Sequence, residues 1–578
     1  MPKRSRSAAR GAGGGGKSAD DKTVVKLSHT LSISEEEVKK MIESKGNDGP
    51  PPTSRRGRSE APKEVKKEDT GVSASSAWAD FMDDEGAEEG VKLESKVSKA
   101  AELVGKNNKY LKVKSDSMEK EEEGREGILI QTGTLDWDTV GRSKKNASEV
   151  GTLDIMEPTV LTRSVFGGRK VRLVAASCTS CHSFAVDVEG KLYGWGRNEA
   201  GQLGNGETKT VTTPTLVETN AKNWSNRKIV SVAVGKSHSV VLDDLGEGWS
   251  VGKNEHGQLG IGSQTDANVL TWKQMKFQDN KVSKLMKVAC GENFTVALNE
   301  EGIVFTTGLS EFGQLGNGET GEYFVTASKL AFTNESKLTQ RRNFVRRDLN
   351  FREGDEPEVL VDSMEVRIGS IACGKNHTVA IECQREKNAP VRVFTWGSGN
   401  YGCLGHKVQK DEHYPRYVET IKGPMFTSNQ PVHCSAGSTC TMIRTSQGHV
   451  YYWGKHRSVG EAQMYPLILD FLANNGHEAR AYDAGNSHVV ISTKEAITVS
   501  YGQGPYGELG FGSEGAKSSS QPSFIDTLNS VKVGSIACGY GHTLVLAENA
   551  EDVEGMDAFE GGKVVKGGAE KGAKKAKA

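Results

Sequence analysis

The chain has 578 residues, of which 26% are charged and 35% hydrophobic, and its formal net charge is −1. This length suffices for one large domain with additional segments, and the balanced charge excludes a protein that is basic throughout. The start, Met-Pro-Lys-Arg-Ser-Arg, has no apolar signal core, and no run of about 18 apolar residues follows, so we expect neither secretion nor a membrane span. An odd number of scattered cysteines, nine, indicates free thiols in a reducing compartment.

Residues 1–126 differ in composition from the rest of the chain. They are rich in Gly, Ser, Lys and Glu, and they contain no aromatic residue before Trp78. Such a segment buries too little apolar surface to offset its conformational entropy, so we expect it to be disordered. We expect the same of residues 549–578, a flexible tail rich in Gly and Lys. The folded domain is predicted to span residues 127–548.

Two basic clusters lie in the N-terminal segment. They consist of Lys3, Arg4 and Arg6, and of Arg55, Arg56 and Arg58. Short Lys/Arg runs are typical of nuclear-import and nucleic-acid-binding segments, and we predict a nuclear protein on this basis. The alternative, solvated charge without a binding role, stays open.

Gly11 to Ser18 matches the phosphate-binding pattern Gly-x-x-x-x-Gly-Lys-Ser. That loop holds phosphate only between a strand and a helix, whereas the ten preceding residues here are basic and polar. Cys178 and Cys181 have no second cysteine pair nearby that would complete a zinc site. We therefore expect neither a cofactor nor a metal.

Five copies of the tetrad Gly-x-Leu-Gly organise the remaining chain, and the first three are 56 residues apart. They begin at Gly201, Gly257, Gly313, Gly402 and Gly507. A second mark, a small residue three positions before a histidine, runs in phase with them. It occurs at Gly235/His238, Gly374/His377, Gly485/His488 and Gly539/His542, with degenerate copies at Thr179/His182, Gly291/Phe294 and Gly437/Cys440. Seven such units predict a repeat array.

Each unit predicts a blade of four short strands. Residues 372–381 form an apolar β-run, residues 391–397 alternate into Trp-Gly, and the tetrad follows. The tetrad glycines favour a tight turn with positive φ, and the leucine between them is expected to fill the core. The predicted fold is an all-β, seven-bladed β-propeller. We interpret the repeated histidines as structural, with hydrogen bonds to the neighbouring blade's backbone, and we predict no covalent enzyme chemistry.

The last unit, residues 536–547, lacks its Trp-Gly strand and its tetrad. Residues 127–133 match the missing strand, and Val140-Gly141 stand at the offsets where a complete unit has Leu404-Gly405. We therefore predict that an N-terminal strand completes the final blade and closes the ring.

The repeat period breaks between Gly313 and Gly402, and we place an insertion at residues 319–366. Insertions on one face of a repeat protein commonly carry binding. We predict a partner-binding patch there, with a decorative charged loop as the alternative. The predicted residues are Arg341, Arg342, Arg346 and Arg347.

A second predicted partner-binding segment follows the fourth tetrad, where the charged run 407–415 contains Lys410, Asp411 and Glu412. The fifth blade has no tetrad after Trp453-Gly454, and we expect Lys455-His456-Arg457 to project there instead.

The combined motifs resemble the regulator of chromosome condensation repeat. The Gly-x-x-His run, Trp-Gly and Gly-Gln-Leu-Gly carry this resemblance throughout residues 127–548. Within the family the chain is most similar to the protein-two, or telophase disc, type, in the entry segment 136–142, the first full blade at 194–199, and the segments 409–412 and 505–510. The resemblance implies a propeller that binds a small GTPase and works in mitosis, on chromatin, on microtubules and at the cell cortex.

Two functions are consistent with this resemblance. The first is nucleotide exchange on a GTPase, with a Rac- or Ral-like partner favoured over Ran because the wedge loop of the Ran exchange factor has no counterpart after Gly308. The second is a chromatin or microtubule adaptor without an effect on nucleotides. Trp78 and Phe81 in the acidic run 75–85 are also compatible with a short motif for a basic partner such as a histone surface.

Overall fold

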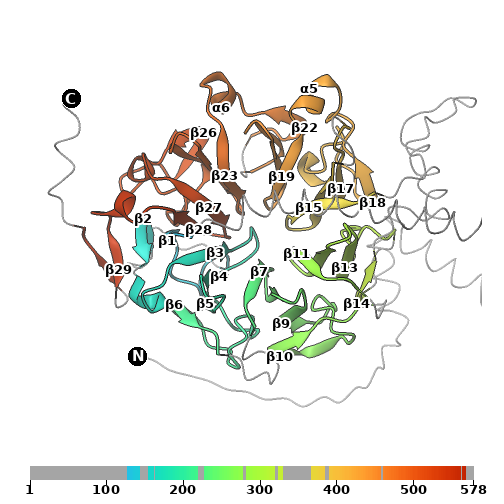
Figure 1. The fold of residues 1–578 in the computed structure, drawn as a ribbon, viewed down its shortest axis with the longest axis horizontal. Coiled ribbons are helices and arrows are strands. Elements are labelled where there is room, and N and C mark those ends of the chain that lie inside the picture. Colours follow the sequence, from blue (N-terminus) through green and yellow to red (C-terminus); the bar gives the residue numbers. More distant parts are fainter. Residues whose placement is uncertain are drawn as a thin grey trace, which may run out of the picture. The chain divides into compact units, whose positions relative to one another are not determined.

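The computed structural model describes residues 126–142, 154–161, 163–218, 227–277, 282–318, 323–329, 366–384, 389–456, 460–560 and 563–567. Their strands form seven sheets, six of four strands and one of six. All their strand pairs are antiparallel except β2 with β29 in the six-stranded sheet. Figure 1 shows the sheets arranged around a ring in chain order. The first strand of each blade contacts the first strand of the next, so these strands are innermost. The prediction of a seven-bladed propeller is confirmed.

The blades are numbered here in chain order. Blade one is β3 (Val171–Ala175), β4 (His182–Asp187), β5 (Leu192–Gly196) and β6 (Val211–Leu216). Blade two is β7 (Ile229–Val234), β8 (His238–Asp243), β9 (Gly248–Asn254) and β10 (Thr265–Gln274). Blade three is β11 (Leu285–Cys290), β12 (Phe294–Asn299), β13 (Val304–Leu309) and β14 (Tyr323–Lys329). Blade four is β15 (Ile368–Cys373), β16 (His377–Glu382), β17 (Val393–Gly397) and β18 (Glu412–Tyr417).

Blade five is β19 (Pro431–Ala436), β20 (Cys440–Thr445), β21 (Val450–Gly454) and β22 (Gln463–Ile468). Blade six is β23 (Ala479–Ala484), β24 (His488–Thr493), β25 (Thr498–Gln503) and β26 (Ser518–Phe524). Blade seven is β27 (Val533–Cys538), β28 (His542–Ala547), β1 (Ile128–Gly133), β2 (Ile155–Leu161), β29 (Ala558–Glu560) and β30 (Lys563–Val565). The short helices are η1 (Arg163–Phe166), η2 (Asn400–Gly402), α5 (Pro424–Ser428), α6 (Asp470–Asn474), η3 (Asp526–Leu528) and η4 (Glu551–Val553).

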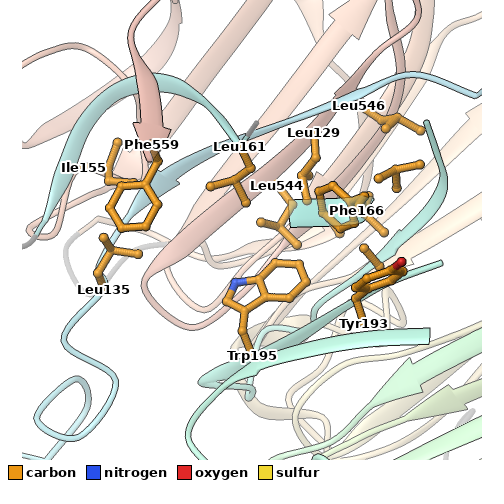
Figure 2. Close-up of a cluster of buried hydrophobic side chains, with 14 of the residues drawn as sticks. Leu129, Leu135, Ile155, Leu161, Phe166, Tyr193, Trp195, Leu544, Leu546 and Phe559 are labelled. Atoms are coloured by element: carbon orange, nitrogen blue, oxygen red, sulfur yellow. The ribbon is translucent and has the colours of Figure 1, made fainter. Parts of the chain in front are cut away.

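The N-terminal strand β1 closes the ring, as predicted. It pairs antiparallel with β28 in the register Gly133↔His542, which is the register that β5 and β4 use in blade one (Gly196↔His182). β2 then supplies the outer strand. Leu129 of β1 and Leu161 of β2 pack with Trp195 of blade one in a single core cluster, shown in Figure 2. The closing strand therefore contributes both hydrogen bonds and buried apolar surface.

The ordered part of blade seven continues beyond residue 548, where we had expected a flexible tail to begin. β29 pairs in parallel with β2 (Val160↔Ala558) and β30 pairs antiparallel with β29. Phe559 is buried in the same cluster as Leu129, close to Ile155 in Figure 2. Burial of this aromatic ring offsets the loss of chain entropy that the glycine- and lysine-rich composition suggested would leave the segment unfolded.

The tetrads form turns of the predicted type. Their glycines have positive φ, and their leucines are at most 2% exposed. The first glycine has a further role, because it lies directly against the outer strand of the next blade. A Cβ on Gly402 would meet Met464, and one on Gly507 would meet Met156. The tetrad therefore fixes the spacing between blades as well as the turn.

The repeated histidines link neighbouring blades, but through hydroxyl groups and not through backbone as predicted. In five blade junctions the histidine Nε2 lies 2.7–3.1 Å from a side-chain hydroxyl of the next blade. This hydroxyl belongs to the residue that directly follows the histidine position of that next blade. The pairs are His182–Ser239, His238–Thr295, His377–Thr441, His488–Thr543 and His542–Ser183. In four of these pairs the hydroxyl in turn donates to a tetrad carbonyl, so the imidazole Nε2–H is the donor. Blade five has Cys440 at the histidine position, and the next blade has Val489 where the hydroxyl would be. A histidine at position 440 would therefore have no hydroxyl partner.

Candidate partner-binding surface

Strand pairing defines one end of the ring as the end that carries the tetrads. The residue that begins the second strand of a blade pairs with the glycine that ends the third, as His377 does with Gly397. The loop before the histidine and the tetrad loop after the glycine therefore emerge together. We call this end the tetrad face.

The predicted site residues fall in two places. Lys410, Asp411 and Glu412 lie on the tetrad face, in or directly after the loop that joins β17 to β18 (residues 398–411, the blade-four loop). The predicted arginines and the basic clusters lie outside the described residues: Arg341, Arg342, Arg346, Arg347, Lys3, Arg4, Arg6, Arg55, Arg56 and Arg58. The connection that contains the four arginines starts after β14, at the end of the sheet opposite to the tetrad face.

Asp411 holds the blade-four loop in place. In blades one and two an asparagine does this, since Asn198 Oδ1 accepts the backbone N–H of Leu203 at 2.9 Å and Asn254 does the same in blade two. Blade four has Gly399 at the equivalent position. Asp411 Oδ1 approaches from the other end of the loop and accepts the N–H of Gly399 at 2.8 Å. The carboxylate is therefore part of the scaffold.

Lys407 occupies a position that the other tetrad loops give to glycine. The equivalent glycines have φ values between 82° and 87° (Gly206, Gly262, Gly318 and Gly512), and Lys407 has φ 66°. A side chain in this left-handed region costs roughly 1 kcal/mol. The conformation is retained because Lys407 N–H donates to Met464 O of blade five at 2.9 Å, as Gly318 does to the next blade. The loop thus keeps the turn and adds a lysine side chain to it.

Tyr401 is the second strained residue of this loop. Its φ is 57°, and it is one of only four non-glycine residues with positive φ in the described part of the chain. The backbone is held there by a hydrogen bond from Tyr401 N–H to Gln409 Oε1 at 3.3 Å. The side chain is 45% exposed, and Lys455 Nζ lies 5.1 Å from the centre of its ring. This distance is within the range of a cation–π contact.

An apolar centre with basic neighbours results. We call it the Tyr401 surface, and it consists of Tyr401, Lys407, Val408, Gln409, Lys410 and Lys455. Val408 is 46% exposed beside the two strained residues. Lys407 and Lys455 make no ion pair with any residue that the structure describes. Exposed strain of this kind persists only where the surroundings enforce it, and it is commonest at functional sites.

Glu412 and the histidine after the fourth tetrad belong to the core and not to this surface. Glu412 is 1% exposed and forms an ion pair with Arg416. His406 Nε2 is hydrogen-bonded to Thr395 Oγ1 at 2.9 Å, and burial lowers the pKa of His406 to about 3. The prediction that Glu412 contacts a partner is therefore corrected, because its carboxylate is already engaged inside the blade.

The irregular fifth blade contributes only one side chain to the Tyr401 surface. Lys455 extends over Tyr401, as expected of a projecting residue. His456 instead packs inward. The centre of its ring lies 4.8 Å from the centre of the Tyr501 ring, and its Nδ1 lies 2.7 Å from Tyr452 OH. The expectation that His456 projects is wrong, because two tyrosines fill the space around it. Arg457 lies outside the described residues.

The loop between β3 and β4 of blade one is longer than its counterpart in blade two. Blade one pairs Ala175 with Phe184, whereas blade two pairs Ala233 with Val240, so the loop of blade one is two residues longer. Cys178, in this loop, is 2% exposed. Burial and then the proximity of Cys440 and Asp483 raise the pKa of Cys178 well above its usual value. The thiol is therefore part of the interior and not of the exposed surface.

Charged side chains join neighbouring loops on the tetrad face. Glu292 of blade three pairs with Lys236 of blade two at 2.5 Å and with Lys375 of blade four at 3.6 Å. These ion pairs link blades two, three and four on the tetrad face. In the described residues, no helix is long and apolar enough to cross a bilayer.

The comparison with known proteins agrees with this architecture. A model of the RCC1-like domain matches residues 154–545. The chain belongs to the RCC1-like domain family. Human Protein RCC2 is 33% identical to this RCC1-like chain over 437 residues, which cover 74% of this chain and 77% of that protein. The zebrafish Protein RCC2 homolog is 31% identical over 437 residues, with 74% and 82% covered. The resemblance to the protein-two type is confirmed.

Solved structures show the same RCC1-like propeller at lower identity. Human WBSCR16 is 18% identical, with 73% of this chain and 100% of that chain covered and a TM-score of 0.55. Prp20p of Saccharomyces cerevisiae is 19% identical, with 76% and 96% covered and a TM-score of 0.55. At these identities the likeness shows the fold alone.

Sequence reasoning identified the segment of the Tyr401 surface but missed its central residue. The available signal was the lysine at position 407, since every other tetrad that is followed by this turn has glycine there. The longer loop of blade one was also missed. The mark Thr179/His182 keeps the usual three-residue spacing, so the two additional residues before it leave no trace in the repeat pattern.

Proposed function

We propose that this RCC1-like propeller binds a small GTPase of the Rac or Ral type and promotes the release of its nucleotide. The observation that carries the proposal is the Tyr401 surface. Its residues are exposed and two of them have a strained backbone, although the packing of the closed ring does not require this conformation. Membership of the family adds support, because the resemblance to the protein-two type implies GTPase binding.

Nucleotide exchange of this kind needs no catalytic acid or base. A partner that distorts the phosphate and magnesium site weakens nucleotide binding, and the nucleotide weakens partner binding to the same extent. An acceleration of roughly 10³-fold requires about 4 kcal/mol of such coupling. A rigid ring can supply this coupling, since its surface does not yield when the GTPase deforms.

Release of mant-GDP from purified Rac, Ral and Ran tests the proposal. The full chain should accelerate release from Rac or Ral in a concentration-dependent manner and have less effect on Ran. Binding without acceleration would instead support the second function, a non-exchanging adaptor for chromatin or microtubules. Prp20p is described as binding Gsp1p and histones, so histones belong in the same binding panel.

We also propose that the protein is nuclear and chromosome-associated, with cytoplasmic and spindle pools in mitosis. The support is the two N-terminal basic clusters, which import receptors read as short Lys/Arg runs. Deletion of residues 1–60 from a tagged chain should shift it to the cytoplasm. Unchanged nuclear fluorescence would assign the signal to the C-terminal lysines or to the propeller.

A further inference from the structure

We propose that the Tyr401 surface is a docking site for an acidic segment of a partner protein that carries one large apolar side chain. This deepens the proposed function by naming the chemistry of the contact, and it rests on that function only in treating the ring as a partner-binding scaffold.

The fold does not need the conformation of Tyr401. The residue before the first tetrad glycine is Ala200 in blade one and Tyr506 in blade six, and neither has positive φ. Ala200 is buried, and Tyr506 packs against a core cluster. Tyr401 alone is turned toward solvent, by a backbone that the hydrogen bonds of Gln409 and Asp411 hold in place.

The charge of the Tyr401 surface is positive. Lys407 follows the tetrad and is exposed, and Lys455 approaches from the next blade. The neighbouring carboxylates are used within the fold, because Asp411 accepts a backbone N–H and Glu412 pairs with Arg416. The surface is therefore complementary to carboxylates, which suit ammonium groups at its rim.

The surface favours a protein segment over a nucleic acid. Both would meet positive charge and an aromatic ring. Val408, however, adds an exposed aliphatic contact beside Tyr401, and one face of the tyrosine ring is already approached by Lys455. A large apolar side chain can use Val408 and the free part of the ring together, whereas a sugar–phosphate backbone gains nothing from the valine. Aromatic anchors at the centre of a polar rim are typical of protein hot spots.

The test uses the full chain and a labelled probe peptide of sequence Glu-Glu-Asp-Phe-Asp-Glu-Glu, followed by fluorescence anisotropy. We expect saturable binding that weakens at high salt, and at least about tenfold weaker binding for Tyr401→Ala. Tyr465→Ala is the matched control, since Tyr465 is 41% exposed on the outer strand β22 of blade five and should not affect binding. A probe with Ala in place of Phe should also bind about tenfold more weakly.

Lys407→Gly separates docking from folding. It restores the glycine of the other tetrad loops, so the melting temperature should rise while peptide affinity falls severalfold. Unchanged affinity in both Tyr401→Ala and Lys407→Gly overturns the proposal. Stronger binding of a single-stranded oligonucleotide at this surface, lost in the same variants, also overturns it and assigns the surface to nucleic acid. The peptide assay contains no GTPase, so loss of peptide binding and absence of mant-GDP release identify separate failures of the two proposals.

Discussion

Blade two and blade seven have the same core geometry, but the chain assembles them differently. Blade two is one continuous segment from β7 to β10, whereas blade seven combines β27 and β28 with β1 and β2 from the other end of the domain. The register is nevertheless identical, with His238 paired to Gly252 and His542 paired to Gly133. The contacts that define a blade therefore do not depend on how the chain connects its strands.

What differs is the consequence of losing a strand. In blade two the outer strand is held by short connections to its own sheet. In blade seven the third strand, β1, is separated from its partner β28 by the whole length of the domain. Without β1, the edge of β28 would be unpaired. Blade seven is thus the place where the stability of the whole ring depends on one N-terminal segment.

Removal of β1 tests this comparison most severely. A fragment that begins at Trp137 lacks Ile128, Leu129 and Ile130, each at most 7% exposed. Burial of each such side chain stabilises by about 1.5–3 kcal/mol, so the summed loss is comparable to the stability of a typical domain. We expect no cooperative unfolding transition by circular dichroism, in contrast to a fragment that begins at Glu126. A synthetic peptide of residues 126–134 added in trans should restore the transition, and equal thermal midpoints for the two fragments would refute the closure argument.

Acid should weaken every histidine junction, including the one at the closing blade. Burial lowers the pKa values of the junction histidines, to about 4 for His238 and His377 and to about 3 for His488 and His542. Below about pH 6.5 the unfolded chain binds protons that the folded ring excludes, so the free energy of unfolding falls as the pH falls. The slope is up to about 1.4 kcal/mol per pH unit for each histidine, and it ends near the lowered pKa values.

Two histidine variants sharpen this prediction. His238→Phe and His542→Phe copy Phe294 of blade three, and each should remove one histidine's share of the pH slope in urea titrations. Each should cost about 1–2 kcal/mol at neutral pH. If blade seven is the weaker junction, His542→Phe lowers the unfolding midpoint more than His238→Phe. Unaltered pH slopes in both variants would show that the histidines do not govern acid stability.

Glu508 gives the junction between blades six and seven an opposite pH dependence. It replaces the glutamine of tetrads one to three, and its Oε2 accepts Tyr506 N–H at 2.8 Å as Gln258 Oε1 accepts His256 N–H. Burial raises the pKa of Glu508 to about 8. The folded state holds a proton that the unfolded chain releases above about pH 4.5, so stability falls as the pH rises toward 8.

Glu508→Gln should therefore stabilise the ring by about 4 kcal/mol at pH 8 and by less than about 1 kcal/mol at pH 5. The reciprocal variant Gln258→Glu places a carboxyl at the same position next to blade two, and we expect it to destabilise as the pH rises. Differential scanning fluorimetry across this pH range measures both. Equal stability of Glu508→Gln and the unmodified chain at pH 8 would mean that the carboxyl is not buried as a neutral acid.

The smallest effect on stability should come from the connection between blades three and four. Charge reversal of Arg341, Arg342, Arg346 and Arg347 should leave the melting temperature nearly unchanged, since exposed charges contribute about 0–1 kcal/mol each. The same variant should weaken binding to a GTPase, microtubules or nucleic acid if these residues form the predicted patch. Calorimetry and co-sedimentation compare it with the unmodified chain, and normal binding to every partner would leave the Tyr401 surface as the remaining candidate.

The repeat marks were sufficient to predict the number of blades, their strand order and the closing strand. These features depend on local geometry: positive φ at Gly402, a buried leucine at Leu404, and a histidine that pairs with the Trp-Gly glycine within the same blade. Such patterns recur in every unit, so the missing strand of the last unit could be recognised in residues 127–133. The segment after the fourth tetrad was also visible, because charged residues follow one another there.

The contacts between units were decided only by the tertiary structure. The hydroxyl that His377 bonds lies 64 residues further along the chain, and a repeat pattern contains no information on how adjacent sheets are aligned. The burial of Cys178 and of Phe559 and the outward turn of Tyr401 all depend on surfaces from other blades or distant segments. Local sequence determines each blade, and the closing strand is recognised because it carries the same local marks. The site and the contacts between blades are set by packing between segments that the chain joins only at a distance.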